Sequence, residues 1–125
     1  MMSKEIWSFE TKNYRVVYAV EPEYDLDLSW DISGATRKGL DSGQLVAFVA
    51  HVYVIHKPTG IMLGDAYLGE CVYETPEAFI DHRGARGIYG SYFVDMIRVV
   101  IENARKAREL IARSNDNEIL SGTTR

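Results

Sequence analysis

Apolar and polar positions alternate along the first half of the chain in the way expected for β-strands. Ile6–Glu10 and Tyr14–Val20 are rich in aromatic and β-branched residues, and the short polar segment between them suits a hairpin. Leu45–Lys57 is nearly apolar on both faces, which is typical of a strand inside a sheet. Lys57–Gly60 has the proline and glycine of a turn, and Ile61–Tyr73 returns as the partner strand. The pattern predicts antiparallel pairing of these segments.

In the last third of the chain the apolar spacing changes to three and four residues, which predicts helices. Thr75 and Pro76 form a start signal for a short helix that ends before Gly84. A long helix is predicted from Ser91 to Arg113, with one apolar stripe facing the sheet. The stripe consists of Phe93, Met96, Ile97, Val100, Ile101, Ala104 and Ile111.

These elements predict an α+β fold, an antiparallel sheet of three to five strands with a long C-terminal helix packed on one face. At 125 residues and 14.2 kDa the chain has the size of one domain. We predict a single domain over residues 1–113 and a flexible, polar tail over residues 114–125. Gly64 and Gly69 are expected to mark bulges or bends in their strand.

The segment Glu21–Gly43 is predicted to be a long acidic connection. Leu28 and Trp30 are expected to pack it onto the body of the protein. Two glycines disfavour a helix near Ala35–Leu40, since glycine lowers helix stability.

Charge is distributed unevenly. The net charge of −4 argues against broad binding to nucleic acid, which usually requires a basic face. Tyr92–Arg113 carries five basic and three acidic residues, whereas Glu21–Asp31 carries five acidic residues and no basic one. We predict that the second segment binds a partner through Glu21, Glu23, Tyr24, Asp25, Asp27, Trp30 and Asp31.

Two other interpretations of this acidic segment stay open, a solvated loop without a partner and a cation-binding loop. The cation-binding interpretation is the weaker one. Leu26 and Leu28 alternate with the acids, Trp30 stands where a ligand would be needed, and the central glycine of a calcium loop is missing. We therefore predict no metal site.

The glycine–arginine segment from His82 to Ser91 is an alternative site. Its three glycines are spaced by three residues and allow close approach of the backbone to a ligand. Two arginines and the start of the long helix add charge and free N–H groups. An anion such as a phosphorylated small molecule or a nucleotide would bind through Arg83, Gly84, Arg86, Gly87 and Ser91. The segment matches neither known phosphate-binding motif, so a plain connector with surface arginines is the competing interpretation.

The remaining reactive residues form no recognisable catalytic pattern. His51 and His56 are five residues apart on one strand, so they point to opposite faces and cannot share a metal. We interpret the histidines as surface or strand-edge residues and Cys71, the single cysteine, as a small core residue. The sequence therefore predicts no enzyme and no cofactor.

The N-terminal segment Met1–Phe9 lacks the apolar core of a signal peptide, and no apolar run reaches the length of a membrane span. We expect a protein of the cytoplasm that has no contact with the membrane.

Four strings resemble a group of short uncharacterised proteins carried by bacteriophages and mobile elements. They are Phe9–Val17, Asp27–Asp31, Tyr67–Gly69 and Tyr89–Met96, and the resemblance spans about Phe9 to Ala112. No site residue carries over from this group. The resemblance implies only the setting in which the protein acts. Small proteins from such elements often inhibit CRISPR or other bacterial defence systems by occupying a binding surface.

The leading hypothesis combines these points. The chain is expected to be a non-enzymatic, anti-CRISPR-like inhibitor in the cytoplasm of the bacterial host. It would bind a host or phage protein complex with a basic surface, without direct contact to nucleic acid. The alternative is the phosphate binder described above. The oligomeric state is not predicted.

Overall fold

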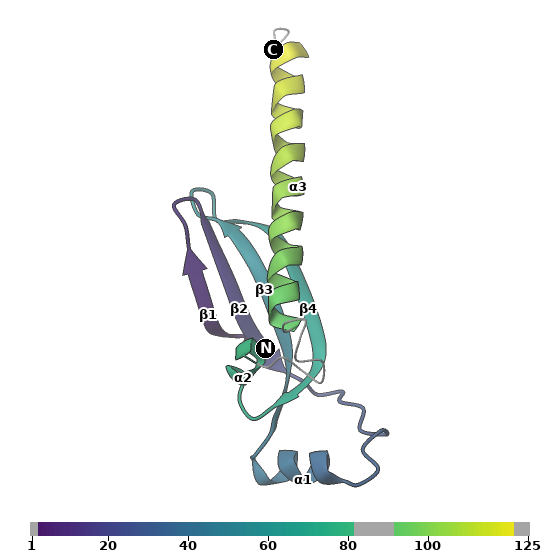
Figure 1. Cartoon of the computed structure of the whole chain (residues 1–125). Coiled ribbons are helices and arrows are strands. Elements are labelled where there is room, and N and C mark those ends of the chain that lie inside the picture. Colours follow the sequence, from purple (N-terminus) through teal and green to yellow (C-terminus); the bar gives the residue numbers. More distant parts are fainter. Residues whose placement is uncertain (1–2, 82–91, 122–125) are drawn as a thin grey trace.

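The computed structural model describes residues 3–81 and 92–121, with side chains over residues 3–80 and 92–112. The strands are β1 (Lys4–Glu10), β2 (Tyr14–Pro22), β3 (Val46–His56) and β4 (Ile61–Tyr73). They form one antiparallel sheet in the order of the chain. The described helices are α1 (Ala35–Ser42), α2 (Ala78–Asp81) and α3 (Tyr92–Ser121). Figure 1 shows α3 lying across the sheet, where it contacts β3 and β4.

This architecture confirms the predicted α+β class. No helix in the described ranges is both long and apolar enough to cross a membrane.

The core lies between α3 and one face of the sheet. Alternate residues of β2 and β3 supply the sheet side, as the period of two predicts, and every third or fourth residue of α3 supplies the other. The buried members include Val16, Tyr18, Val20, Phe48, Ala50, Val52, Val54, Phe93, Met96, Val100 and Ala104. Burial of each larger side chain contributes roughly 1.5–3 kcal/mol.

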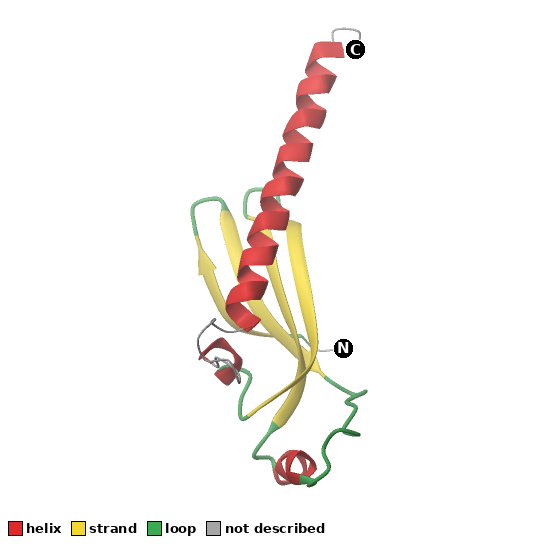
Figure 2. Ribbon diagram, turned by 45° about the vertical axis from the view of Figure 1, so that its right-hand side comes forward, coloured by secondary structure: helices red, strands yellow, loops and turns green. Residues whose placement is uncertain are grey.

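Helix α3 is longer than the sequence pattern predicts. It continues past Arg113 to Ser121, and Figure 2 shows its C-terminal part extending beyond the sheet. Neither glycine nor proline occurs between Tyr92 and Ser121, so the polar composition alone does not end the helix. Ile111, predicted to belong to the buried stripe, is 50% exposed, and it lines a hollow with Tyr14 and Ile61 of the sheet. The last residues of the predicted tail, 122–125, lie outside the described ranges.

An aromatic cluster fixes α2 and the start of α3 on the sheet. Phe79 is fully buried, and its ring centroid lies 5.5 Å from that of Tyr18, 5.4 Å from that of Tyr73 and 6.3 Å from that of Phe93. The Tyr18 hydroxyl donates a hydrogen bond of 2.8 Å to the carbonyl oxygen of Pro76. A buried tyrosine hydroxyl needs such a partner, so this bond fixes the segment before α2 against β2.

Two local signals of the sequence are confirmed. The Thr75 hydroxyl oxygen accepts a 3.1 Å hydrogen bond from the N–H of Ala78, as expected for a residue that starts a helix. In the β3–β4 turn, Gly60 has a φ of 73°, and its N–H donates to the carbonyl oxygen of His56 over 2.7 Å. Glycine adopts this left-handed conformation without steric cost.

Helix α1 contradicts the expectation that its glycines prevent a helix. The Asp31 carboxylate accepts hydrogen bonds from the N–H groups of Thr36 and Arg37, at 3.3 and 3.0 Å. It thereby supplies acceptors for two N–H groups of the first turn that have no partner within the helix. The Leu45 side chain packs directly on Gly39, where a Cβ atom would lie 2.5 Å from its Cδ1. A cap and a packing contact from residues five or six positions away therefore outweigh the low helix propensity of this segment.

The predicted bulges in β4 are confirmed as register shifts opposite β3 near Gly64 and Gly69. Gly64 also brings α3 close to the sheet. A Cβ atom at this position would lie 2.9 Å from the carbonyl oxygen of Val100 and 3.2 Å from the backbone nitrogen of Ala104.

We expect Gly64→Ala to lower the free energy of unfolding by about 1–3 kcal/mol, because the backbone of α3 must move outward to make room. Urea denaturation measures the change. Gly69→Ala is the matched control in the same strand, since the nearest atom to its Cβ, Oε2 of Glu23, is 3.4 Å away. Equal losses in the two variants would contradict the close approach of α3 at Gly64.

Candidate functional site

A groove of about 610 Å³ follows the outer edge of β4. Every residue from Leu68 to Glu74 lines it. Successive side chains of a strand point to opposite faces, so a hollow on one face would be lined by every second residue only. The unbroken run therefore places the groove along the edge of the strand. β4 is the last strand of the sheet, and no described strand pairs with this edge.

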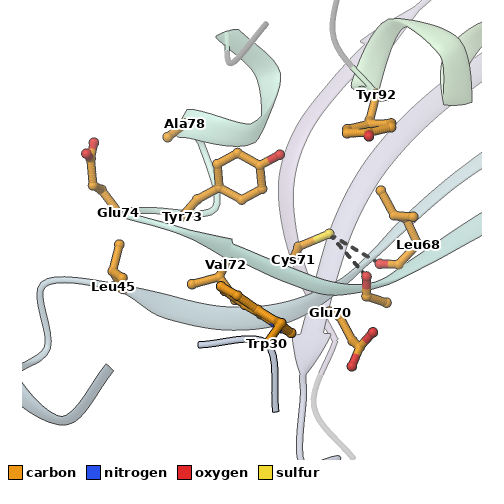
Figure 3. Close-up of a pocket in the computed structure, with 11 residues that line it drawn as sticks. Trp30, Leu45, Leu68, Glu70, Cys71, Val72, Tyr73, Glu74, Ala78 and Tyr92 are labelled. Atoms are coloured by element: carbon orange, nitrogen blue, oxygen red, sulfur yellow. Dashed lines mark hydrogen bonds between the residues drawn. The ribbon is translucent and has the colours of Figure 1, made fainter. Parts of the chain in front are cut away.

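The walls of the groove come from segments far apart in the sequence. Figure 3 shows Trp30 and Leu45 on one side of β4, and Ala78 and Tyr92 on the other. Trp30 is 60% exposed and Tyr92 is 56% exposed, so both rings are accessible. The expectation that Trp30 packs the acidic segment onto the body is therefore wrong. Leu28 is half-buried.

Carboxylates help to hold the acidic loop (Glu21–Asp31) on the protein. Its first two residues, Glu21 and Pro22, belong to β2, so the connection begins at Glu23 and not at Glu21 as predicted. The Glu23 carboxylate accepts the N–H of Glu70 at 2.9 Å and that of Asp25 at 3.2 Å. The Glu70 carboxylate in turn accepts the N–H of Asp27 at 3.1 Å. Glu70 has a φ of 56°, a conformation that non-glycine residues rarely adopt, at the bulge of β4. These reciprocal bonds fasten the loop to the edge of β4 at one end of the groove.

Two further acids of the loop have local structural roles. The Asp27 carboxylate accepts a 2.9 Å hydrogen bond from the N–H of Ser29, and the bonds from Ser29 lower the pKa of Asp27 below its usual value. Asp31 accepts the two N–H groups at the start of α1. In the described part of the chain, no hydrogen bond to the carboxylate of Glu21 or Asp25 is found, so these two charges remain available to a partner.

The structure brings part of the predicted partner site together. Trp30 lines the groove, and Glu23 and Asp27 connect the loop to it. Tyr24 is 77% exposed and Asp25 is exposed, whereas Glu21, Glu23 and Asp31 are half-buried. The predicted anion-binding residues, Arg83, Gly84, Arg86, Gly87 and Ser91, lie outside the described residues, and that site stays a prediction.

Cys71 lies against the core side of the groove and is only 3% exposed. Its thiol donates a hydrogen bond to the carbonyl oxygen of Leu68 at 3.4 Å (Figure 3). Burial raises the pKa of the Cys71 thiol to about 11, so it stays protonated at neutral pH. This confirms its interpretation as a core residue.

His51 and His56 differ in burial and in the face of the sheet on which they lie. His51 is only 7% exposed, because β3 is an inner strand, so its interpretation as a surface or strand-edge residue is wrong. Its Nε2 lies 3.0 Å from Oδ2 of Asp65, and its ring stacks on Tyr67 with centroids 3.9 Å apart. His56 lies beside Tyr14, on the side of the core, so the two histidines point to opposite faces as predicted. Over the residues with described side chains, no three His, Cys, Asp or Glu residues converge as metal ligands would.

The sequence did not identify the edge of β4 as a site. Glu70, Glu74 and Tyr92 belong to the groove and carried no motif. Gly69 was the one available signal, since a glycine inside a strand can mark a bulge. The position of β4 at the edge of the sheet depends on strand order, which the hydrophobic pattern does not contain.

Comparison of the chain with models of protein families, with curated proteins and with solved structures gave no match. The resemblance to phage-borne proteins therefore stays an expectation.

We expect Asp31→Ala to destabilise α1 locally, because two N–H groups at its start lose their acceptor. The free energy of local opening should fall by about 0.5–2 kcal/mol, measured as faster amide hydrogen exchange in Ala35–Ser42. Asp25→Ala removes the same charge without removing such an acceptor and should leave exchange in α1 unchanged. Equal effects of both substitutions would show that net charge, rather than the cap, stabilises α1.

The Cys71 thiol should react with iodoacetamide at pH 8 about a hundredfold more slowly than a free thiol, since its raised pKa leaves little thiolate. Unfolding the chain in guanidinium chloride should restore the ordinary rate. The folded-state rate should rise with pH until the pKa near 11 is reached. Fast labelling of the folded protein would contradict the buried position of this thiol.

Proposed function

We propose that the protein is a non-enzymatic binding protein. Its acidic loop and the adjoining groove would meet a basic surface of a partner protein. The observation that carries this proposal is an ordered loop that presents large apolar side chains to solvent beside carboxylates that form no ion pair with the described residues.

The exposed side chains of this region are of the kind that anchors protein interfaces. Tyr24 is 77% exposed, Trp30 is 60% exposed and Ile32 is 98% exposed. Aromatic residues dominate the energetics of protein interfaces when a partner covers them. The bonds among Glu23, Glu70 and the loop backbone hold the loop in place before binding, which reduces the entropy lost on association.

The charge of the site selects the partner. Glu70 and Glu74 line the groove, Asp25 is exposed on the loop, and the described lining contains no lysine or arginine. A negative surface of this kind attracts a positive one and accelerates its association.

The resemblance to phage-borne proteins narrows the class of partner. Defence complexes that hold nucleic acid do so in positively charged channels. An acidic protein that occupies such a channel would inhibit the complex without catalysis. We therefore propose a nucleic-acid-binding complex of a bacterial defence system as the partner, and the bacterial cytoplasm as the place where the protein acts.

The double variant Glu21→Gln, Asp25→Asn tests this proposal, because it removes two charges without removing a bond that orders the loop. The wild-type protein should capture a dominant partner with a basic surface from a bacterial lysate. The double variant should bind the purified partner about tenfold more weakly, with a smaller dependence on salt. Titration at several salt concentrations provides the measurement.

The matched control is Glu102→Gln, Glu109→Gln, which removes two charges from the exposed side of α3. It should bind the partner like the wild type. Equal binding by all three proteins, or a captured partner without a basic surface, would refute a role of the acidic loop in association.

A further inference from the structure

We infer that the groove binds an extended segment rich in lysine or arginine, which pairs with the outer edge of β4 as an additional strand. This inference rests on the proposed function and specifies how the partner is held. The acidic loop attracts the partner, and the strand edge beside it receives the partner's backbone.

The shape of the groove favours a strand over a helix or a compact surface. Its floor is the edge of β4 over Leu68–Tyr73, continued by Glu74, and its two walls stand on opposite faces of the sheet (Figure 3). A strand added to a sheet lies about 4.8 Å from its neighbour and sends its side chains toward both faces. The Glu23 carboxylate already occupies the N–H of Glu70, so such a segment would pair beyond it, over Cys71–Glu74, and would extend roughly 13 Å at about 3.3 Å per residue. Binding of this kind obtains its affinity from backbone hydrogen bonds and its specificity from side-chain contacts.

The walls determine which side chains fit. Trp30 on one side and Tyr92 on the other present exposed aromatic rings. Figure 3 shows Val72 and Glu70 on the side of Trp30, and Glu74 on the side of Ala78. Lysine and arginine side chains fit these walls, because their charged ends pair with carboxylates and also pack against aromatic rings. A segment that alternates basic and apolar residues therefore suits the two faces of the groove.

The same charges disfavour a second copy of the chain as the occupant. Two β4 edges that pair with each other would bring four carboxylates, those of Glu70 and Glu74 in each copy, into one interface. Like charges at neighbouring positions of paired strands destabilise the pairing. Natural proteins use charges and bulges at edge strands to prevent such self-association, and the bulge at Glu70 has the same effect.

The probe for this inference is a fluorescent eight-residue peptide that alternates lysine and valine, with a glutamate–valine peptide as its control. Fluorescence anisotropy should show saturable binding of the lysine peptide and none of the glutamate peptide. Absence of binding of the lysine peptide would overturn the inference. The proposed function would stand in that case if the loop variant still lost the captured partner.

N-methylation of the peptide separates strand pairing from plain charge attraction. N–H groups of a strand point alternately to its two sides, so methylation of every second amide blocks one edge only. Two peptides, methylated on the lysine amides or on the valine amides, carry equal charge. One should bind about tenfold more weakly and the other like the unmodified peptide. Equal binding of both would overturn the strand pairing.

Substitutions in the protein provide the second arm of the test. Glu74→Lys should weaken binding of the lysine peptide about tenfold, because it places like charge in the groove. Glu109→Lys changes the net charge equally on the exposed side of α3 and should leave binding unchanged. Equal weakening by both substitutions would overturn the location. Light scattering of the free protein should show a monomer, whereas a dimer that Glu74→Lys alters would assign the edge to a second copy.

Discussion

The burial of Phe79 against the aromatic residues of the sheet is the constraint on which the rest of this structure depends. The residue comes from a helix of one turn, which would not be stable alone, because so short a helix cannot repay the entropy of its nucleation. Packing on Tyr18, Tyr73 and Phe93, with the hydrogen bond from Tyr18 to Pro76, supplies the missing stability. This cluster also positions the end of β4 and the start of α3. It therefore sets the geometry of one wall of the groove.

The other wall of the groove, beside the acidic loop, is stabilised by hydrogen bonds to carboxylates. The acidic loop has few buried apolar residues, and its order comes from carboxylates that accept backbone N–H groups. Charge-assisted hydrogen bonds of this kind are stronger than those between neutral groups. One set of acids thus orders the loop, while Asp25 and the exposed aromatic residues remain free to contact a partner. The high density of acids in this segment reflects both requirements.

The edge of β4 must avoid unspecific strand pairing and yet remain accessible to a partner. An open strand edge invites pairing with any exposed strand, which promotes aggregation. The edge of β4 contains a bulge at Glu70, and its carboxylates disfavour pairing with an acidic or identical strand. Its neighbours Trp30 and Tyr92 keep aromatic surface accessible at the same place. The edge of β4 therefore disfavours pairing with a second copy of the chain and accepts a segment of opposite charge.

The sequence by itself determined the elements of this fold that depend on local periodicity and turn chemistry. The alternation of apolar residues gives β2, β3 and β4, and the three- and four-residue spacing gives the buried stripe of α3. The turn at Gly60 and the cap at Thr75 follow from the residue types at those positions, because all these features involve neighbours in the chain. It also pointed to Trp30 and the acidic loop, since clustered charge is visible without a structure.

Only the tertiary structure decided the features that depend on distant contacts. The Tyr18 hydroxyl meets the carbonyl oxygen of Pro76, and Gly64 lets the backbone of α3 approach β4, although each pair is far apart in the sequence. His51 is buried because β3 lies inside the sheet, and the groove exists because β4 lies at its edge. Strand order and the meeting of Glu23 with Glu70 arise from long-range packing, which no local pattern of residues encodes.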